Sequence, residues 1–268
     1  MNDPSASARL CPICAEPARL ALRKEANVCC ADYFEGCRQF PADVGAVDVL
    51  ECAACGFAWM PALHAWDGAR LHSEIYNGDY TLCDPHFLEI RPQKLAAWLA
   101  PLCAGRSLLD YGGGAGRLAE LLRGFGVAAE SYDPFFDAST PPDHTFDLVT
   151  AFEVIEHVGA QNRLFAALAA LLKPGASLIV STLLKPMRLE GDHWYSCARN
   201  GHISFHSAAS LAQTLTQAGL AFISLSDELH VAAREHTALT PWKTATPIQI
   251  SGQPGFQTAP PWRDFIPA

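Results

Sequence analysis

Residues 107–122 read SLLDYGGGAGRLAELL, a short apolar run that passes directly into a glycine-rich turn and then into an amphipathic stretch. This order predicts a β-strand, a tight turn and an α-helix. Gly112, Gly114 and Gly116 allow the backbone to turn sharply and to approach a ligand closely, while the start of the helix offers free N–H groups to an anion. The stretch therefore predicts a site for a cofactor with an anionic group, although a glycine repeat alone also fits a NAD site or a structural turn.

Short apolar runs alternate with helical stretches on both sides of this turn. The runs expected as strands are 107–112, 127–133, 146–154, 177–184, 221–227 and 229–235. The stretches expected as helices are 86–102, interrupted at Pro92, then 117–126, 161–175 and 207–219. This alternation predicts βαβ units and a mostly parallel sheet that is covered on both faces. The last two runs are expected to form an antiparallel hairpin at one edge.

Two acidic residues distinguish this glycine turn from a generic one. Asp110 lies at the end of the strand before the first glycine, and Asp133 closes the next apolar run. A carboxylate at Asp133 can accept hydrogen bonds from both hydroxyls of a ribose. Asp110 can orient the glycine turn or face an amino group of the cofactor. The alternative interpretation is that both carboxylates are ordinary caps at strand ends.

With these residues in place, residues 86–235 resemble the class I S-adenosylmethionine-dependent methyltransferases. The motifs that carry the resemblance are, in chain order, LLDYGGGAG, SYDP, FDLVTAFEVIEHV and LLKPGASLIVS. The resemblance implies a Rossmann-like α/β fold that binds S-adenosylmethionine. It also implies that Asp110 and the three glycines named above hold the methionine part, that Asp133 holds the ribose, and that Phe152 and Glu153 lie beside the methionine end.

The segment between Asp133 and Phe146 departs from that family pattern. Residues 134–145 read PFFDASTPPDHT, where the family usually has a helix and a third strand. Two adjacent prolines disfavour a helix here. We expect the third strand and its helix to be shortened to a loop or absent. The acid that binds adenine is then unassigned, with Asp143 as a candidate.

The amino-terminal region is rich in cysteine. Cys11-Pro-Ile-Cys14 and Cys52-Ala-Ala-Cys55 form two CxxC pairs, a spacing that places four thiolates around one Zn²⁺ ion. Four protein ligands leave no open position, so the zinc is expected to be structural. A redox-active pair is the alternative, because CxxC also occurs in thiol oxidoreductases. The other cysteines of this region either replace one ligand or are buried thiols; they are Cys29, Cys30 and Cys37.

The order CPIC, ECAACGF, IYNGDY and a class I domain resembles bacterial methyltransferases with an amino-terminal zinc module, among them deoxysugar methyltransferases.

Two histidines are the candidate catalytic bases. His157 follows the apolar run 146–154 at the ligand-binding edge and is the first candidate base, and His202 in the segment 191–207 is the second. The alternative for Glu156 and His157 is a capping role. Tyr76 and Tyr80 either close the pocket or pack between the domains.

Composition narrows the classes of function. The chain has 268 residues and a formal net charge of -9, with no basic tract, so nucleic acid is not expected as a partner. No apolar run approaches the roughly 20 residues that span a bilayer, and the amino terminus shows no signal-peptide pattern, so a cytoplasmic location without a membrane partner is expected. The expected organisation is a zinc-binding module at 1–62, a connector at 63–85, the cofactor-binding domain at 86–237 and an extended, proline-rich tail at 238–268.

The predicted function is S-adenosylmethionine-dependent methylation of an oxygen or carbon atom of a small-molecule acceptor, such as a sugar or a secondary metabolite. An RNA or protein methyltransferase is one alternative, and a non-catalytic module that retains the cofactor-binding fold is another. The identity of the acceptor and the oligomeric state are left open by the sequence.

Overall fold

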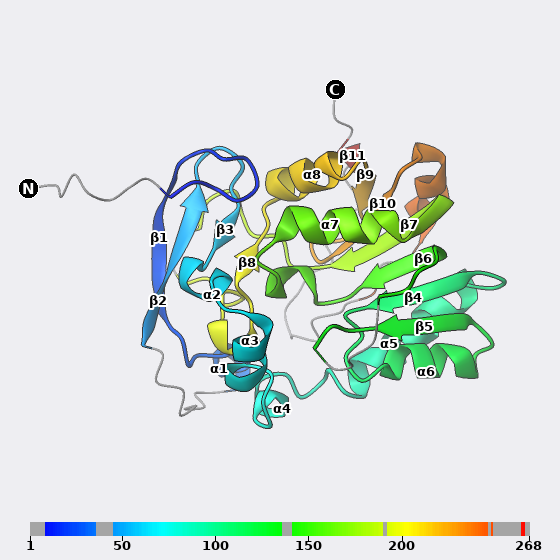
Figure 1. The fold of residues 1–268 in the computed structure, drawn as a ribbon, viewed down its shortest axis with the longest axis horizontal. Helices are drawn as coiled ribbons and strands as arrows, with labels where there is room; N and C mark the ends of the chain where they lie inside the picture. The colour runs from blue at the N-terminus through cyan, green and yellow to red at the C-terminus, as the bar shows by residue number, and fades with distance from the viewer. Residues whose placement is uncertain are drawn as a thin grey trace, which may run out of the picture.

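Two β-sheets organise the chain in the computed structural model, a small one near the amino terminus and a large one beside it (Figure 1). The structure describes residues 9–35, 45–135, 141–189, 192–245, 248 and 264–265. Among these residues, no helix combines the length and apolar character that crossing a bilayer requires.

The large sheet has the strand order β11-β9-β10-β7-β6-β4-β5. Its strands are β4 (Ser107–Tyr111), β5 (Ala128–Tyr132), β6 (Phe146–Ala151), β7 (Leu172–Ser181), β9 (Ala221–Ser224), β10 (Leu229–Ala233) and β11 (Asp264–Phe265). Strands β5, β4, β6 and β7 pair in parallel, whereas β10, β9 and β11 add to the sheet antiparallel. The predicted mostly parallel sheet and the β9–β10 hairpin are therefore confirmed.

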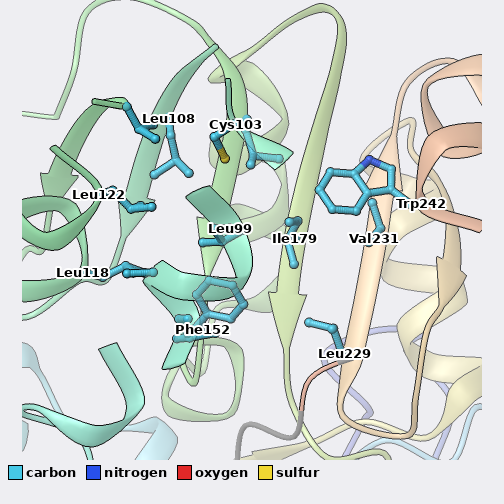
Figure 2. Packing of buried hydrophobic residues seen from close by; sticks show 14 of the residues in the cluster. Leu99, Cys103, Leu108, Leu118, Leu122, Phe152, Ile179, Leu229, Val231 and Trp242 are labelled. Atoms are coloured by element: carbon cyan, nitrogen blue, oxygen red, sulfur yellow. The ribbon is translucent and has the colours of Figure 1, made fainter. Parts of the chain in front are cut away.

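Helices cover both faces of this sheet. One layer consists of α5 (Ile90–Leu99), η1 (Ala100–Leu102), α6 (Arg117–Gly124) and η4 (His236–Thr244), and the other of α7 (Gln161–Ala170) and α8 (Ala208–Gln217). Because side chains alternate along a strand, Leu108 packs towards the α5 and α6 layer and Leu109 towards the α7 and α8 layer. Figure 2 shows the first of these cores, in which Leu99 and Leu122 lie near the sheet.

The sheet reverses its winding between β4 and β6. The chain goes from β4 to its neighbour β5 on one side, and from β6 to its neighbour β7 on the other. Ligands of such sheets bind at this switch point, beyond the carboxyl ends of the strands. No strand or helix occurs between β5 and β6 in the described residues 133–135 and 141–145, in agreement with the expected shortening.

The small sheet has the order β1-β2-β3-β8. It is formed by β1 (Ala18–Glu25), β2 (Ala46–Cys52), β3 (Ala58–Trp59) and β8 (Ser204–Phe205), with α1 (Asp32–Glu35) between the first two strands. All of its pairings are antiparallel. Strand β8 comes from the segment after β7, so the small sheet is completed by a part of the chain far from the amino terminus.

Three short helices lie in the predicted connector, 63–85, and at its start. They are α2 (Pro61–His64), α3 (Gly68–Glu74) and α4 (Tyr80–Cys83). Leu63, Leu71 and Ile75 of this segment are buried in a third core with Phe205 of β8. Two short 3-10 helices, η2 (Ile155–His157) and η3 (Ala198–Asn200), lie next to this core, and they carry side chains of the candidate site.

A buried ion pair joins the two sheets. Lys185, which follows β7, lies 3.0 Å from Glu51 of β2 between Nζ and Oε1, and both side chains are almost fully buried. The backbone N–H of Leu189 donates to the same oxygen at 2.7 Å. Removing one partner of a buried pair typically costs ~3–5 kcal/mol because an uncompensated charge remains. The pair therefore makes the small sheet and the large domain depend on each other.

Two local expectations differ from the structure. Helix α5 begins at Ile90, so Pro92 lies in its first turn, where its missing N–H costs no helical hydrogen bond, and it does not interrupt the helix. The tail was expected to be extended, but it begins with the helix η4, whose Trp242 donates from Nε1 to Ser177 Oγ at 3.0 Å and is buried in the core of Figure 2. Most of the remaining tail lies outside the described residues.

Candidate functional site

A cavity of about 460 Å³ lies at the switch point of the large sheet. Its floor is the turn after β4 and the segment after β6, and its far wall is the connector and the start of α5. The predicted site residues that line it are Asp110, Gly112, Gly114, Asp133, Phe152, Glu153 and His157. Gly116 and His202 do not line this cavity. Tyr76 and Tyr80 of the connector do, and their ring centroids are 5.2 Å apart.

The glycine turn packs too closely for side chains. Gly112 has a φ of +72°, and a Cβ placed on it would lie 2.5 Å from Val154 Cγ2. A Cβ on Gly113 would lie 2.4 Å from both Asp110 Oδ2 and Ser131 Oγ. Gly116, with a φ of +78°, is the N-cap of α6. The turn therefore requires glycine for two reasons, a left-handed backbone and direct contact with the strands beneath it.

Asp133 is held in one orientation at the end of β5. Its Oδ2 accepts a hydrogen bond from the Gly114 N–H at 2.9 Å, and its Oδ1 accepts one from the Phe135 N–H at 2.8 Å. Each carboxylate oxygen has a second acceptor position. The carboxylate therefore bridges the glycine turn and the β5 end, and it can still accept bonds from ligand hydroxyls in the cavity that it lines.

Asp110 is buried beneath the same turn. Thr150 Oγ1 donates to its Oδ1 at 3.0 Å. Burial raises the pKa of Asp110 to about 7, an effect that the Thr150 bond partly opposes and the nearby Asp133 charge adds to. A carboxyl group with this pKa ionises readily when a cationic group approaches. The residue thus suits an ammonium group of a ligand.

Glu153 lies where the chain leaves β6. Its φ of +53° is unusual for a residue other than glycine, and it is supported by Ser181, which accepts from the Glu153 N–H at 2.7 Å and donates to Oε1 at 2.9 Å. Burial raises the pKa of Glu153, although the charge of Arg91 opposes this shift. Arg91 is itself held by Asp84 through two hydrogen bonds of 2.8 and 3.1 Å.

The two candidate histidines lie beside each other but face different spaces. Their ring centroids are 5.0 Å apart. His157 lines the large cavity, whereas His202 is buried and lines a smaller pocket behind it. Burial lowers the pKa of His202 to about 4 and that of His157 well below its ordinary value, so both rings are neutral near pH 7. A ligand in the large cavity can therefore reach His157 directly, while His202 supports it from behind.

Glu156 is the buried partner of this pair. Tyr195 donates from its hydroxyl to Glu156 Oε1 at 2.6 Å, and His157 Nε2 lies 4.0 Å from the same oxygen. Asp143, the candidate for adenine, is exposed and contacts His144 at 3.3 Å, and it does not line the cavity.

The four cysteines predicted to bind zinc converge beside the small sheet. Sulfur–sulfur distances are 3.6 Å for Cys11–Cys55, 3.4 Å for Cys14–Cys52 and 3.5 Å for Cys14–Cys55. The N–H groups of Ile13 and Cys55 point to sulfurs of the same cluster at 3.4 and 3.5 Å. A tetrahedral S4 metal site needs this clustering of sulfurs, so the donor set fits a zinc ion.

The alternative cysteine ligands do not join this cluster. The Cys30 N–H donates to Asn200 Oδ1 at 2.7 Å, and its sulfur lies 3.7 Å from His202 Nδ1. Cys29 packs against Cys83. Both are buried thiols away from the four-sulfur cluster, while Cys37 lies outside the described residues.

The sequence did not single out several residues of this site. Gly113 supports the turn, and Asp84 and Arg91 form one wall of the cavity. Asp84 and Arg91 are seven positions apart across the end of the connector, which is not a recognisable pairing pattern. By contrast, Tyr76 and Tyr80 of the IYNGDY segment and Tyr195 of the segment 191–207 carried a signal, since aromatic residues often line ligand pockets.

Comparisons with known proteins show which family this chain is similar to. A family model described as a methyltransferase domain matches residues 87–225, more than half of the chain. The ubiquinone biosynthesis O-methyltransferase of Thiobacillus denitrificans is 32% identical over 123 residues, which cover 35% of this chain and 52% of the relative. The corresponding protein of Xanthomonas axonopodis pv. citri is 26% identical over 192 residues, covering 56% and 77%.

The match thus spans about half the length of the Thiobacillus relative. Among solved structures, human N-acetylserotonin methyltransferase in complex with SAM overlaps with a TM-score of 0.45 at 15% identity, covering 63% of this chain and 60% of that one. From the match of the family model, with the cofactor motifs gathered around one cavity, the chain belongs to the class I S-adenosylmethionine-dependent methyltransferases.

Proposed function

We propose that this protein transfers a methyl group from S-adenosylmethionine to an oxygen atom of a small-molecule acceptor. The observation that carries the proposal is that Asp110, the glycine turn, Asp133 and His157 line one cavity. Its volume of about 460 Å³ falls within the range of small-molecule sites. The curated relatives are O-methyltransferases by name, which favours oxygen over carbon.

The residues around the turn fit the cofactor. When bound, S-adenosylmethionine supplies a methyl group on a positively charged sulfur. We assign Asp133 to the ribose hydroxyls, and Asp110 with Gly112, Gly114 and Gly116 to the methionine part. Phe152 and Glu153 lie beside that part, so the reacting end of the cofactor points towards His157. The two carboxylates match this ligand. Asp133 has free acceptor positions for the ribose hydroxyls, and Asp110 ionises when the ammonium group approaches.

The methyl acceptor is expected to bind at the end of the cavity that is lined by His157 and the connector tyrosines. A hydroxyl becomes a better nucleophile when it loses its proton. A neutral imidazole promotes this loss in two ways, either by accepting the proton or by holding a metal ion that lowers the pKa of the hydroxyl. Tyr76 and Tyr80 offer aromatic rings to a flat or sugar-like acceptor.

Replacing His157 with alanine tests the acceptor end. We expect turnover of S-adenosylmethionine to S-adenosylhomocysteine, measured with a panel of phenolic and sugar hydroxyl acceptors, to fall about 10²–10⁴-fold while cofactor affinity is retained. His72→Ala is the matched control, because His72 is exposed on α3. Equal turnover in His157→Ala and wild type would remove His157 from the mechanism. A wild type that binds the cofactor but methylates no acceptor would favour the non-catalytic alternative.

The pKa of Asp110 makes a separate prediction about cofactor binding. Since this pKa is about 7 in the free protein, Asp110 is mostly protonated at pH 6, and an approaching ammonium group favours its ionised form. Binding of S-adenosylmethionine at pH 6 is therefore expected to release up to about one proton, and affinity should weaken as the pH falls below 7. Calorimetry in two buffers of different ionisation enthalpy measures the release. Asp110→Asn should show none; equal release in this variant would contradict the assignment.

We also propose that Cys11, Cys14, Cys52 and Cys55 hold a structural zinc ion. The ion would connect the loop before β1 with the β2–β3 turn, since each supplies two of the cysteines. The proposed boundaries are 1–62 for this module, 63–85 for the connector and 86–237 for the catalytic domain. The module is not self-contained, because β8 and Lys185 of the catalytic domain complete its sheet and its ion pair.

A further inference from the structure

Three potential metal ligands converge behind the acceptor end of the cavity. They are Glu156 and His157 of η2 and His202 after η3, and one ligand atom from each lies within 4.8 Å of the other two. The Ile203 N–H donates to the backbone oxygen of Glu156 at 2.8 Å, which ties the two segments together. The cluster therefore depends on tertiary structure that brings together residues more than 40 positions apart.

Two polar atoms of this cluster are buried without a hydrogen-bond partner among the described residues. They are Glu156 Oε2 and His157 Nδ1. Glu156 is fully buried, and its other oxygen already accepts the Tyr195 hydroxyl. Leaving a buried carboxylate oxygen unsatisfied is costly, so this atom requires a partner such as a metal ion, an ordered water or a proton shared with Glu153.

Tyr195 orients two of the three ligands. Its hydroxyl donates to Glu156 Oε1 at 2.6 Å, and its backbone oxygen contacts His202 Nδ1 at 2.8 Å. A carbonyl oxygen only accepts, so Nδ1 of the neutral ring carries the proton and the lone pair is on Nε2. Metal-binding histidines characteristically have the second nitrogen held by a carbonyl or carboxylate in this way.

The surrounding charges favour a cation. Glu153 and Glu156 place two carboxylates in a buried region. The Arg91 guanidinium, whose charge acts on Glu153 and His157, is bound at two points by Asp84, which partly balances it. Burying carboxylates is unfavourable unless they are paired or coordinate a metal.

From these contacts we infer that Glu156, His157 and His202 bind one divalent transition-metal ion. Two imidazoles and one carboxylate suit ions such as Zn²⁺, Mn²⁺ or Fe²⁺ better than Mg²⁺ or Ca²⁺, which prefer oxygen. Three protein ligands leave positions open, and His157 places the ion at the wall of the large cavity. This site is separate from the four-cysteine cluster.

The role of the ion rests on the proposed function. An acceptor hydroxyl that coordinates the ion has a lowered pKa and releases its proton to solvent water. The acceptor oxygen then forms a bond to the methyl carbon, the carbon–sulfur bond breaks, and its electron pair stays on sulfur, which becomes a neutral thioether. His157 acts in this scheme as a ligand rather than as the proton acceptor.

Cobalt binding tests the site directly. Purified full-length protein, with its cysteine site filled with zinc, is titrated with Co²⁺, and bound cobalt is followed by its visible absorption and by elemental analysis after desalting. We expect one additional cobalt per chain, without the intense charge-transfer band of cobalt thiolates. Affinity should fall at least about 10-fold in Glu156→Gln and His202→Ala, and about 10–100-fold in Tyr195→Phe. His72→Ala should bind as wild type does.

Glu156→Gln keeps the shape of the side chain, so circular dichroism is expected to show a native fold even if His202→Ala is unstable. The inference would be overturned if wild-type protein bound no additional cobalt, or if wild type and Glu156→Gln bound it equally well. A proton shared between Glu153 and Glu156 would then explain the buried Glu156 carboxyl group. A protein that binds cobalt at this site but not S-adenosylmethionine would refute the proposed function while the metal site stands. Methyl transfer by a protein that does not bind cobalt would refute the metal site and leave the proposed function standing.

Discussion

Cys52→Ser is expected to remove about one zinc ion per chain and to lower the melting temperature by roughly 10 °C. The four sulfurs join the loop before β1 to the β2–β3 turn, and this part of the chain has only a small core of its own. Losing a structural metal site of this kind costs at least about 3 kcal/mol, and each kcal/mol shifts the melting temperature by about 2–4 °C in a chain of this size. Elemental analysis and thermal unfolding measure the two effects.

The matched control is Cys197→Ser. Cys197 is equally buried, but its sulfur donates to the Trp194 backbone oxygen at 3.0 Å, a bond that serine can replace, and it is not part of the four-sulfur cluster. This variant should keep its zinc. Wild-type protein prepared without chelator that contains much less than one zinc per chain would contradict the proposal, as would a Cys52→Ser variant with unchanged metal content.

Gly113→Ala is expected to weaken binding of S-adenosylmethionine by at least about 100-fold, which corresponds to ~2.7 kcal/mol. The added Cβ would lie 2.4 Å from two side-chain atoms beneath the turn, Asp110 Oδ2 and Ser131 Oγ. Because Thr150 holds the Asp110 carboxylate through its other oxygen, we expect the turn to shift away from β4 and β5. The same shift displaces Gly114, whose N–H holds Asp133 in position.

Gly124→Ala provides the matched control for this substitution. Gly124 is the last residue of α6, the helix that follows the glycine turn, and a Cβ there meets no atom within 4 Å. Its cofactor affinity should equal that of wild type. If Gly113→Ala bound the cofactor normally while remaining folded, the cofactor would have to lie away from the glycine turn.

The central part of the fold was predictable because its signals are local. Strand β4, the glycine turn and α6 follow each other without a break, and β6 and β7 are buried on both faces, so they appear as continuous apolar runs. The positions of Asp110 and Asp133 follow from the same pattern, since residues at the carboxyl ends of neighbouring parallel strands lie together.

The small sheet was not predictable from local pattern. Strand β1 reads ARLALRKE and is mostly exposed or half-buried, so it shows no clear alternation. Strand β8 has two residues and is defined only by its partner β3. The η4 helix at the start of the tail has little sequence signal because it is held by packing of Trp242 against the core.

The contacts of the candidate catalytic residues were not predictable from local pattern either. Periodicity placed His157 at the ligand-binding edge, but it does not reveal that His202 lies behind His157 rather than in the cavity. That arrangement depends on Tyr195, whose hydroxyl and backbone oxygen connect segments distant in sequence. The clustering of Glu156 with both rings is likewise a tertiary property.

Calorimetric titration with S-adenosylmethionine, with NADH as the control ligand, tests whether this cavity binds the cofactor. We expect micromolar binding of S-adenosylmethionine, no comparable binding of NADH, and clear weakening in Asp133→Ala, because the ribose hydroxyls lose their carboxylate acceptor. Absence of binding, preference for NADH, or unchanged affinity in Asp133→Ala would contradict the assignment of this cavity to the cofactor.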